Sequence, residues 1–134
     1  MIKEVKEDEL DLLDNSFINI NSLKEEFKSN PFAKLLLLEE NDEIIGYIYY
    51  SDIYERVEIN QFEINSIHRN CGKGNYLLKE FTKYVDKDIT LEVKENNYSA
   101  IHLYKKHGFK KVARRKGYYQ SIDGILMERK KDSN

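Results

Sequence analysis

A short glycine-containing segment, RNCGKG at residues 69–74, constrains this chain more than any other feature. Strand-like residues precede it at 55–64, and apolar residues recur at helical spacing after it, from Leu77 to Val85. Backbone N–H groups in a glycine-rich turn that opens a helix can surround an anion, and the positive end of the helix dipole adds to the attraction. Glycine suits such a turn because a side chain would block the close approach of a phosphate. The segment therefore predicts a strand, a phosphate-binding turn and a helix in succession.

Three phosphate-binding sequence patterns can be compared with this segment. The nucleoside-triphosphate loop requires serine or threonine after the lysine and an earlier glycine five residues before Gly72, and the chain has neither. The dinucleotide pattern G-x-G-x-x-G requires a third glycine where Leu77 stands. The third pattern, R-x-x-G-x-G, is met in full from Arg69 to Gly74. A glycine turn that only happens to precede a helix is the alternative, and these six residues alone do not choose between the two interpretations.

The remaining segments predict a sheet with helices around it. Helical patterns cover 8–15 and 22–29, and Ser22 with Glu25 has the spacing of a capping box. A helix follows the glycine segment to about residue 86, and another runs from Tyr98 to His107 and ends at Gly108. Strand-like segments are 33–40, 43–53, 55–64, 89–93, 109–119 and 124–130.

The order of these segments predicts the fold class. The turn at 41–43 joins the first two strands into a hairpin, and strands alternate with helices after residue 64. An antiparallel first half followed by strand–helix alternation gives an α/β (α+β) fold with a mixed, mostly antiparallel sheet and helices on both faces. We expect one domain that covers residues 1–134.

Composition excludes several classes of protein. The chain has 134 residues, 34% of them charged, and a formal net charge of −2, which disfavours a general nucleic-acid binder. No apolar run approaches the roughly 20 residues of a membrane helix, and the acidic N-terminus lacks the layout of a signal peptide. A single cysteine, Cys71, cannot form an internal disulfide. We therefore expect a cytoplasmic protein that does not contact a membrane.

A second segment decides how the glycine turn is interpreted. The sequence LEVKENNYSAIHLYKKHGF at 91–109 resembles the continuation of the GNAT N-acetyltransferases: a strand that ends in L-E-V, an asparagine four residues on, and then A-x-x-L-Y-x-x-x-G-F. The R-x-x-G-x-G loop serves the pyrophosphate of coenzyme A in that family, and both segments stand in its order and spacing. RRKGYY at 114–119 and DGILMERK at 123–130 resemble the tail of the RimI-type enzymes, which acetylate the N-terminal alanine of a ribosomal protein.

The resemblance implies a cofactor, acetyl-CoA, and a set of roles. Backbone groups from Phe62 to Ile64 would hold the acetyl group and the pantetheine arm, and Asn97 would hold the cofactor from the opposite side. Tyr104 would face the thioester sulfur, and Glu92 would act as the base. The acceptor would be a protein N-terminus, from a ribosomal protein in the RimI branch. The residues that would wrap the pyrophosphate are Arg69, Asn70, Cys71, Gly72, Lys73, Gly74 and Asn75.

Several alternatives stay open at this point. Glu92 could simply face solvent, Tyr104 could be a core tyrosine, and Tyr118 and Tyr119 could line the substrate slot or fill a β-surface. The acceptor could be a small amine such as a polyamine or an aminoglycoside, or the chain could bind acyl-CoA without turnover. The basic run from 105 to 116 is interpreted as a solvated edge, with attraction of the cofactor's 3′-phosphate or of an acidic partner as the alternative. The three histidines share no metal-ligand spacing, so we expect no metal site.

Overall fold

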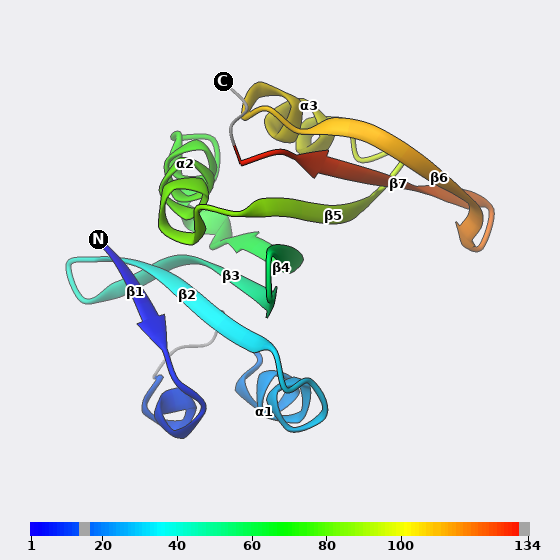
Figure 1. The fold of residues 1–134 in the computed structure, drawn as a ribbon. Coiled ribbons are helices and arrows are strands. Elements are labelled where there is room, and N and C mark those ends of the chain that lie inside the picture. The colour runs from blue at the N-terminus through cyan, green and yellow to red at the C-terminus, as the bar shows by residue number, and fades with distance from the viewer. Residues whose placement is uncertain (14–16, 132–134) are drawn as a thin grey trace.

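The computed structural model describes residues 1–13 and 17–131, and its centre is a seven-stranded sheet (Figure 1). The strand order across the sheet is β1-β2-β3-β4-β5-β7-β6. The strands are β1 (Ile2–Val5), β2 (Ala33–Glu40), β3 (Glu43–Ile53), β4 (Arg56–Ile64), β5 (Asp88–Lys94), β6 (Lys110–Tyr119) and β7 (Ile122–Arg129). The helices are η1 (Glu7–Leu12), α1 (Ile20–Ser29), η2 (Ser66–His68), α2 (Lys73–Val85) and α3 (Tyr98–Lys106), with η1 and η2 of the 3₁₀ type.

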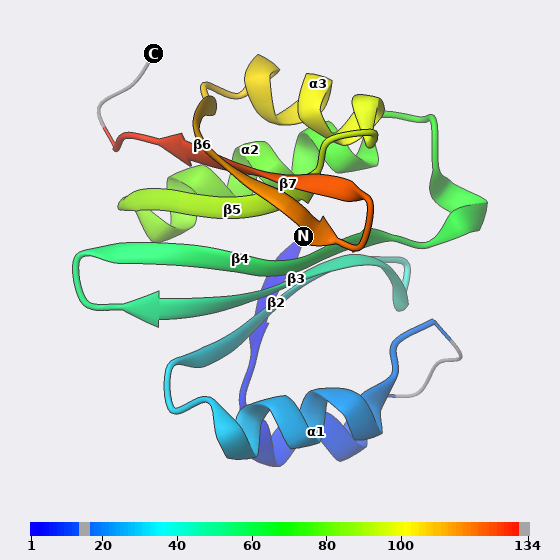
Figure 2. The ribbon, with the colours of Figure 1, turned by 90° about the vertical axis from the view of Figure 1, so that its right-hand side faces the viewer.

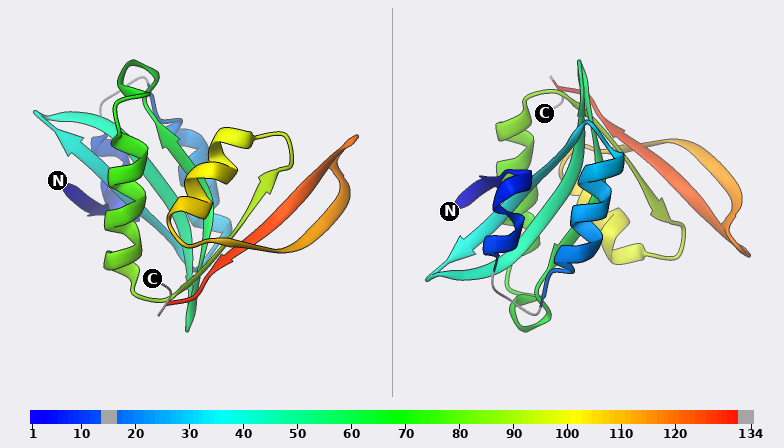
Figure 3. Two further views of the ribbon diagram at one scale, coloured as in Figure 1. Left: turned by 90° about the horizontal axis from the view of Figure 1, so that it is seen from above. Right: turned by 90° about the horizontal axis from the view of Figure 1, so that it is seen from below.

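All neighbouring strands are antiparallel except β4 and β5, which run parallel. Helices α2 and α3 cover one face of the sheet, and η1 and α1 cover the other (Figure 3). The α/β class with a mixed, mostly antiparallel sheet and helices on both faces is therefore confirmed.

Each face of the sheet has its own apolar core, and β2 contributes to both. Leu36 and Leu38 belong to the core beneath α2 and α3, whereas Leu35 and Leu37 belong to the core beneath α1 and η1. All four leucines are fully buried. A strand that is covered on both faces has no solvent side, which is why its sequence is a continuous apolar run rather than an alternating one.

Most of the predicted elements are confirmed within one or two residues, but the N-terminal region differs. The strand β1 was not predicted; it pairs with Leu35–Leu38 of β2 and is too short to give a pattern of its own. The predicted helix over 8–15 is a 3₁₀ helix at Glu7–Leu12, and the end of the prediction lies outside the described residues. The predicted capping box at Ser22 is wrong: α1 begins earlier, and the Asn19 side chain accepts from the Ser22 amide at 3.0 Å.

The sheet opens at its middle, where the parallel strands β4 and β5 separate (Figure 2). Their pairing joins Arg56–Ile59 to Asp88–Leu91 and ends there. The pairing of β3 with β4 jumps from Gln61 to Ile59 at the same point, so Asn60 is the extra residue of a β-bulge. Beyond it, the remainder of β4 faces no neighbouring strand on the β5 side, and this opening determines where a ligand can enter.

A polar network holds the bulge in place. The Ser51 hydroxyl donates to the side-chain oxygen of Asn60 at 2.7 Å and accepts from the Asn30 side chain at 2.8 Å. Asn30 follows α1 directly and also donates to the hydroxyl of Tyr49 at 2.9 Å. The end of α1 is thus connected to the position where the sheet opens. None of the helices in the described ranges, 1–13 and 17–131, is long and apolar enough to span a membrane.

Candidate functional site

A cleft of about 760 Å³ occupies the opening between β4 and β5 and continues along α2 and α3. It lies where the sheet loses its pairing, so main-chain groups of β4 and side chains of β5 and α3 border the same space. Twelve of the fourteen site residues predicted from the sequence line this cleft: Phe62, Ile64, Arg69, Asn70, Gly72, Lys73, Gly74, Asn75, Glu92, Asn97, Tyr104 and Tyr119.

The peptide groups at the end of β4 face the cleft. The Asn65 amide donates to the Ile45 carbonyl at 2.8 Å, so Gly46 and Ile64, which lie opposite each other, form a non-hydrogen-bonded pair of the antiparallel ladder. The peptide groups of Ile64 and, two residues earlier, of Phe62 therefore point away from β3 and into the opening. An extended chain laid along this edge could exchange hydrogen bonds with both residues.

The loop after β4 forms an open cradle at one end of the cleft. Asn70 (φ 63°) and Gly72 (φ 82°) are left-handed, and α2 begins at Lys73. Apart from Gly72 and its two chain neighbours, no described residue has a heavy atom within 4 Å of the position that a Cβ on Gly72 would take. Arg69 folds back along β4, where its Nε donates to the Ile64 carbonyl at 3.0 Å. The first amides of a thirteen-residue helix thus border open space, which is the arrangement that binds a phosphate.

Side chains of the loop are already engaged with protein groups. The Lys73 ammonium contacts both oxygens of Glu40, at 2.7 and 2.9 Å, and this hydrogen bond lowers the pKa of Glu40 and raises that of Lys73. The His107 ring contacts the side-chain oxygen of Asn75 at 3.0 Å. Burial, and then the charge of Lys106, lower the pKa of His107, so a neutral ring donates to Asn75 at pH 7. The loop therefore offers a phosphate mainly its amides and the helix dipole.

Tyr104 belongs both to the core and to the cleft. It is 8% exposed, and its ring lies between those of Phe62 and Phe109, with centroids at 6.2 and 5.6 Å. Burial, and secondly the negative charge of Glu63, raise the pKa of Tyr104 to about 12. The phenol is therefore protonated over the whole physiological range and can act as a hydrogen-bond donor to a group in the cleft.

Glu92 lies on β5, on the opposite side of the opening from β4. One carboxylate oxygen, Oε1, accepts from the Arg115 guanidinium of β6 at 3.0 Å. The other, Oε2, is buried and has no hydrogen-bond partner in the part of the chain that the structure describes. It lies against Gly124, where any Cβ would overlap with it, and the same Cβ would come within 3.3 Å of the Tyr119 ring. Gly124 is thus the residue that makes room for the carboxylate.

Two predicted site residues do not border the cleft. The Cys71 thiol contacts the backbone carbonyl of His68 at 2.7 Å, although both neighbours of Cys71 line the cleft. Tyr118 is half exposed and lies against Arg115, whose guanidinium carbon is 4.0 Å from the centre of the ring. Adjacent tyrosines on a strand point to different sides, and here Tyr119 alone lines the cleft.

Asn97 was expected as a cofactor contact, and it is also the cap of α3, because its Oδ1 accepts from the Ala100 amide at 3.3 Å. Several other residues that line the cleft were not predicted. Gln61 and Glu63 alternate with Phe62 and Ile64 along β4, and this period of two could have identified them. The unpredicted polar residues that line the cleft are Asn60, Gln61, Glu63, His68, Lys94 and Ser99.

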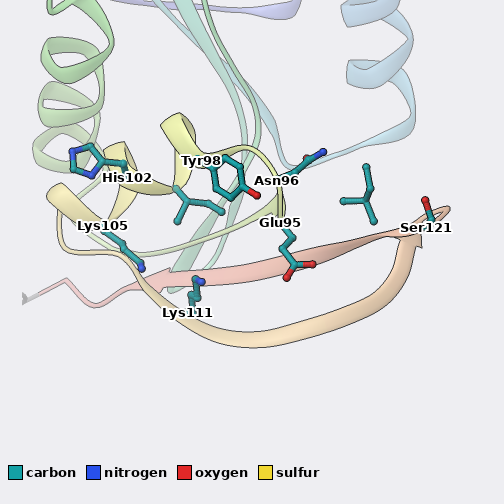
Figure 4. A pocket seen from close by; sticks show the side chains of 9 residues that line it. Glu95, Asn96, Tyr98, His102, Lys105, Lys111 and Ser121 are labelled. Carbon is teal, nitrogen blue, oxygen red and sulfur yellow. The ribbon is translucent and has the colours of Figure 1, made fainter.

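A second hollow, of about 510 Å³, lies on the opposite face of α3 and contains none of the predicted site residues (Figure 4). Tyr98, His102 and Lys105 of α3 border it together with Lys111 of β6. The basic run from 105 to 116 continues along β6, where Arg114 pairs with Glu95 at 2.8 Å. Among residues 1–13 and 17–131, no group of His, Cys, Asp and Glu side chains is arranged to hold a metal ion.

Comparison with known proteins identifies the class to which this fold and cleft belong. Residues 4–109 match the model of the acetyltransferase (GNAT) family, and the chain is a member of that family. The ribosomal protein bS18-alanine N-acetyltransferase of Haemophilus influenzae is 36% identical over 103 residues, which are 72% of this chain and 70% of that protein. A Bacillus subtilis protein provisionally named for the same activity is 30% identical over 113 residues, 80% of this chain and 75% of its own length.

The fold agrees with that of a solved structure. The crystal structure of the ribosomal-protein-S18-alanine N-acetyltransferase from Escherichia coli superposes with a TM-score of 0.80 and covers 100% of this chain and 95% of its own. The two sequences are 18% identical, so this comparison bears on the fold alone.

Proposed function

We propose that this chain transfers the acetyl group of acetyl-CoA to the α-amine of a protein N-terminus. One observation carries the proposal: the cleft where β4 and β5 separate has the glycine-containing loop at one end and both Tyr104 and Glu92 on its walls. The names of the two bacterial relatives describe N-acetylation of an alanine of ribosomal protein bS18. A ribosomal protein N-terminus is therefore the acceptor we propose.

The residues present fit acetyl-CoA, which supplies the acetyl group as a thioester. The loop from Arg69 to Asn75 would hold the pyrophosphate through backbone amides, because the space in front of Gly72 is open. The peptide groups of Phe62 and Ile64 would form hydrogen bonds with the pantetheine arm, which would take the place of a neighbouring strand. The Ile64 amide is the group we assign to the carbonyl oxygen, in the manner of an oxyanion hole.

Tyr104 would stabilise the departing sulfur by donating a hydrogen bond. A thiol has a pKa near 8.5, and the pKa of the Tyr104 phenol is raised to about 12. Complete transfer of the phenol proton to the thiolate would be uphill by about 5 kcal/mol at 1.36 kcal/mol per pKa unit. Donation of a hydrogen bond has no such penalty, so Tyr104 acts as a donor rather than as a full acid.

Glu92 would remove the proton from the acceptor. An α-amine has a pKa of about 7.7–8.0, so roughly a tenth of it is neutral at pH 7, whereas less than about one lysine amine in a thousand is neutral. A single carboxylate therefore has a lighter task on an N-terminus than on a lysine. This difference favours an α-amine as the acceptor.

A paired peptide assay tests the acceptor. One peptide has a free N-terminal alanine, and its partner has the same sequence with a blocked N-terminus and an internal lysine. We expect acetylation of the free α-amine, located by tandem mass spectrometry, and a rate that rises from about pH 7 to 8 and then levels off with the α-amine. Acetylation confined to lysine, or transfer only to polyamines or aminoglycosides, would contradict the acceptor but leave the acetyltransferase assignment intact.

A chain that binds acyl-CoA without turnover is the remaining alternative. Calorimetric titration with acetyl-CoA, combined with an isotope-labelled transfer assay on the two peptides and on free amines, distinguishes it. Tight binding with no labelled product on any amine would identify a binding module. Labelled product on the free N-terminus supports the proposed enzyme.

A further inference from the structure

Arg115 is the one donor to the Glu92 carboxylate among the residues that the structure describes. Its guanidinium donates to Oε1 at 3.0 Å, while Oε2 is enclosed against Gly124 and has no hydrogen-bond partner within 1–13 and 17–131. A buried acceptor without a hydrogen bond costs free energy, and more so when it is charged. The contact with Arg115 is therefore the interaction that offsets this cost and fixes the carboxylate at the wall of the cleft.

The surroundings of Glu92 keep it in this position. Gly124 lies opposite both Lys94 of β5 and Arg115 of β6, and its lack of a side chain leaves the space that Oε2 occupies. Tyr119 lies beside the same space and lines the cleft. Burial, and next the charge of Glu92, raise the pKa of Tyr119, which agrees with its closeness to the carboxylate.

Arg115 is itself fixed by the hairpin between β6 and β7. The pairing of β6 with β7 is irregular between Arg115 and Tyr119, and Gly117 has a φ of 61° within this irregularity. The resulting bend places the Tyr118 ring over the guanidinium group, at 4.0 Å from its central carbon. The N–H donors of a guanidinium lie in its own plane and remain available when its face stacks on a ring. Tyr118 can therefore contact the face of Arg115 while Arg115 donates to Glu92.

We propose that Arg115 is a positioning residue for Glu92: it fixes the carboxylate through Oε1 at the wall of the cleft, beside Tyr119, where the carboxylate would receive the acceptor proton. The inference rests on the proposed function, because it assumes that Glu92 receives the acceptor proton. In that step an N–H bond of the ammonium breaks, an O–H bond forms on the carboxylate, and the nitrogen lone pair becomes free for attack on the acetyl carbonyl.

The test compares two arginines of the same strand. Arg115→Gln removes the contact to Glu92, and Arg114→Gln removes a cross-strand ion pair to Asp123 and Glu95 that does not involve Glu92. We expect Arg115→Gln to lower kcat about tenfold with acetyl-CoA affinity unchanged, since displacement of a catalytic group lowers the rate steeply. Arg115→Lys should restore most of the loss, and Arg114→Gln should stay within about twofold of the parent chain.

A double-mutant cycle separates positioning from a structural role. In a Glu92→Gln background, Arg115→Gln should cost no further activity, because the group it positions is already inactive. Equal losses from the two arginine variants, full activity of Arg115→Gln, or an undiminished further loss in the Glu92→Gln background would overturn the inference. Thermal melts of every variant identify a loss that comes from unfolding.

Failure of the proposed function can be distinguished from failure of the positioning role of Arg115. If the parent chain acetylates lysine or a polyamine instead of an α-amine, the proposed acceptor is wrong, and the same comparison is made with that amine. Nitrogen-15 NMR of the arginine side chains gives a readout without turnover. We expect slowed guanidinium rotation for Arg115 that is lost in Glu92→Gln, and fast rotation in the parent chain would overturn the inference even if acetyl transfer occurs.

Discussion

The two walls of the cleft are built from different parts of the polypeptide. The wall formed by the end of β4 and the loop to Asn75 presents peptide groups and the first amides of α2. The wall formed by β5, α3 and the β6–β7 hairpin presents the side chains of Glu92, Tyr104 and Tyr119. In the proposed function, binding at the first wall would depend on where the backbone lies, so we expect it to tolerate many changes of side chain. Chemistry at the second wall would depend on single functional groups, so we expect it to tolerate few.

The largest effect is expected from the removal of one functional group on the second wall. Tyr104→Phe deletes a hydroxyl and almost no volume, so we expect turnover to fall by about 10²–10³ while acetyl-CoA affinity stays similar. Because the pKa of Tyr104 is about 12, the phenol is protonated from pH 6 to 9, and the ratio of the two rates should not change over this range. Steady-state kinetics measure the turnover of the two proteins, and thermal melts on the same preparations measure their stability. Parent-like turnover with a lowered melting temperature would reduce Tyr104 to a core residue.

On the first wall, adding a side chain should have more effect than removing one. A Cβ on Gly74 would contact Leu103, Ile64 and Phe62 at 3.7–3.9 Å, so the fold has room for it, and helix propensity favours alanine or valine over glycine there. We expect Gly74→Val to weaken acetyl-CoA binding at least tenfold, because the branched side chain extends into the cleft where the cofactor is proposed to lie.

Gly74→Ala and Gly72→Val are the comparison variants for this prediction. The alanine variant should weaken binding less than valine and keep or raise the melting temperature. Valine at Gly72 should also weaken binding, but its left-handed backbone (φ 82°) adds strain, which makes Gly74 the cleaner position. Calorimetric titration measures all three affinities. Tight acetyl-CoA binding by the Gly74 and Gly72 valine variants would remove the phosphate-loop interpretation.

A pair of glycines behind the two walls sharpens the comparison. A Cβ on Gly46 would lie 2.6 Å from a methyl group of Ile64 and 2.8 Å from the Glu63 carbonyl, so Gly46→Ala must displace the end of β4. We expect a loss of about 1–3 kcal/mol in the free energy of unfolding and weaker acetyl-CoA binding, measured by denaturant titration and calorimetry. Gly124→Ala meets the flexible end of Glu92 instead, so it should lower kcat and leave acetyl-CoA affinity unchanged. If Gly46→Ala lowered kcat alone and Gly124→Ala weakened acetyl-CoA binding, the two walls would not have separate roles in binding and in chemistry.

The loop of the first wall could be predicted from one short segment of the sequence, whereas the contacts that hold the second wall together could not. The loop from Arg69 to Gly74 is a local pattern, since glycine positions and the start of a helix are fixed within a few residues. The contact of Arg115 with Glu92 depends instead on the register of β5, β7 and β6, which are brought together from distant parts of the chain. The spacing of residues within one segment does not reveal how that segment is aligned with strands from elsewhere in the chain.

The bulge at Asn60 and the strand β1 escaped prediction for related reasons. Asn60 has no partner in the register of β3 with β4, and its side chain accepts from Ser51 of β3, so the bulge is a property of the pairing rather than of the strand sequence. The strand β1 is defined by the leucines of β2, against which its four residues pair. Alternation along β6 places Tyr118 and Tyr119 on different sides, but the register between Arg115 and Tyr119 is irregular, so counting along RRKGYY does not predict which of the two lines the cleft.

The smallest effect is expected at Cys71, which lies inside the loop but does not border the cleft. Its thiol contacts the His68 carbonyl, and the amides that face the open side of the loop are unchanged when the thiol is removed. Cys71→Ala should therefore bind acetyl-CoA within about twofold of the parent chain and keep its turnover, in contrast to the tenfold loss expected three residues away at Gly74. Parallel calorimetric titrations of the two variants measure the difference. A loss at Cys71 as large as that of Gly74→Val would mean that side chains hold the phosphate, and the contrast between a backbone wall and a side-chain wall would then be wrong.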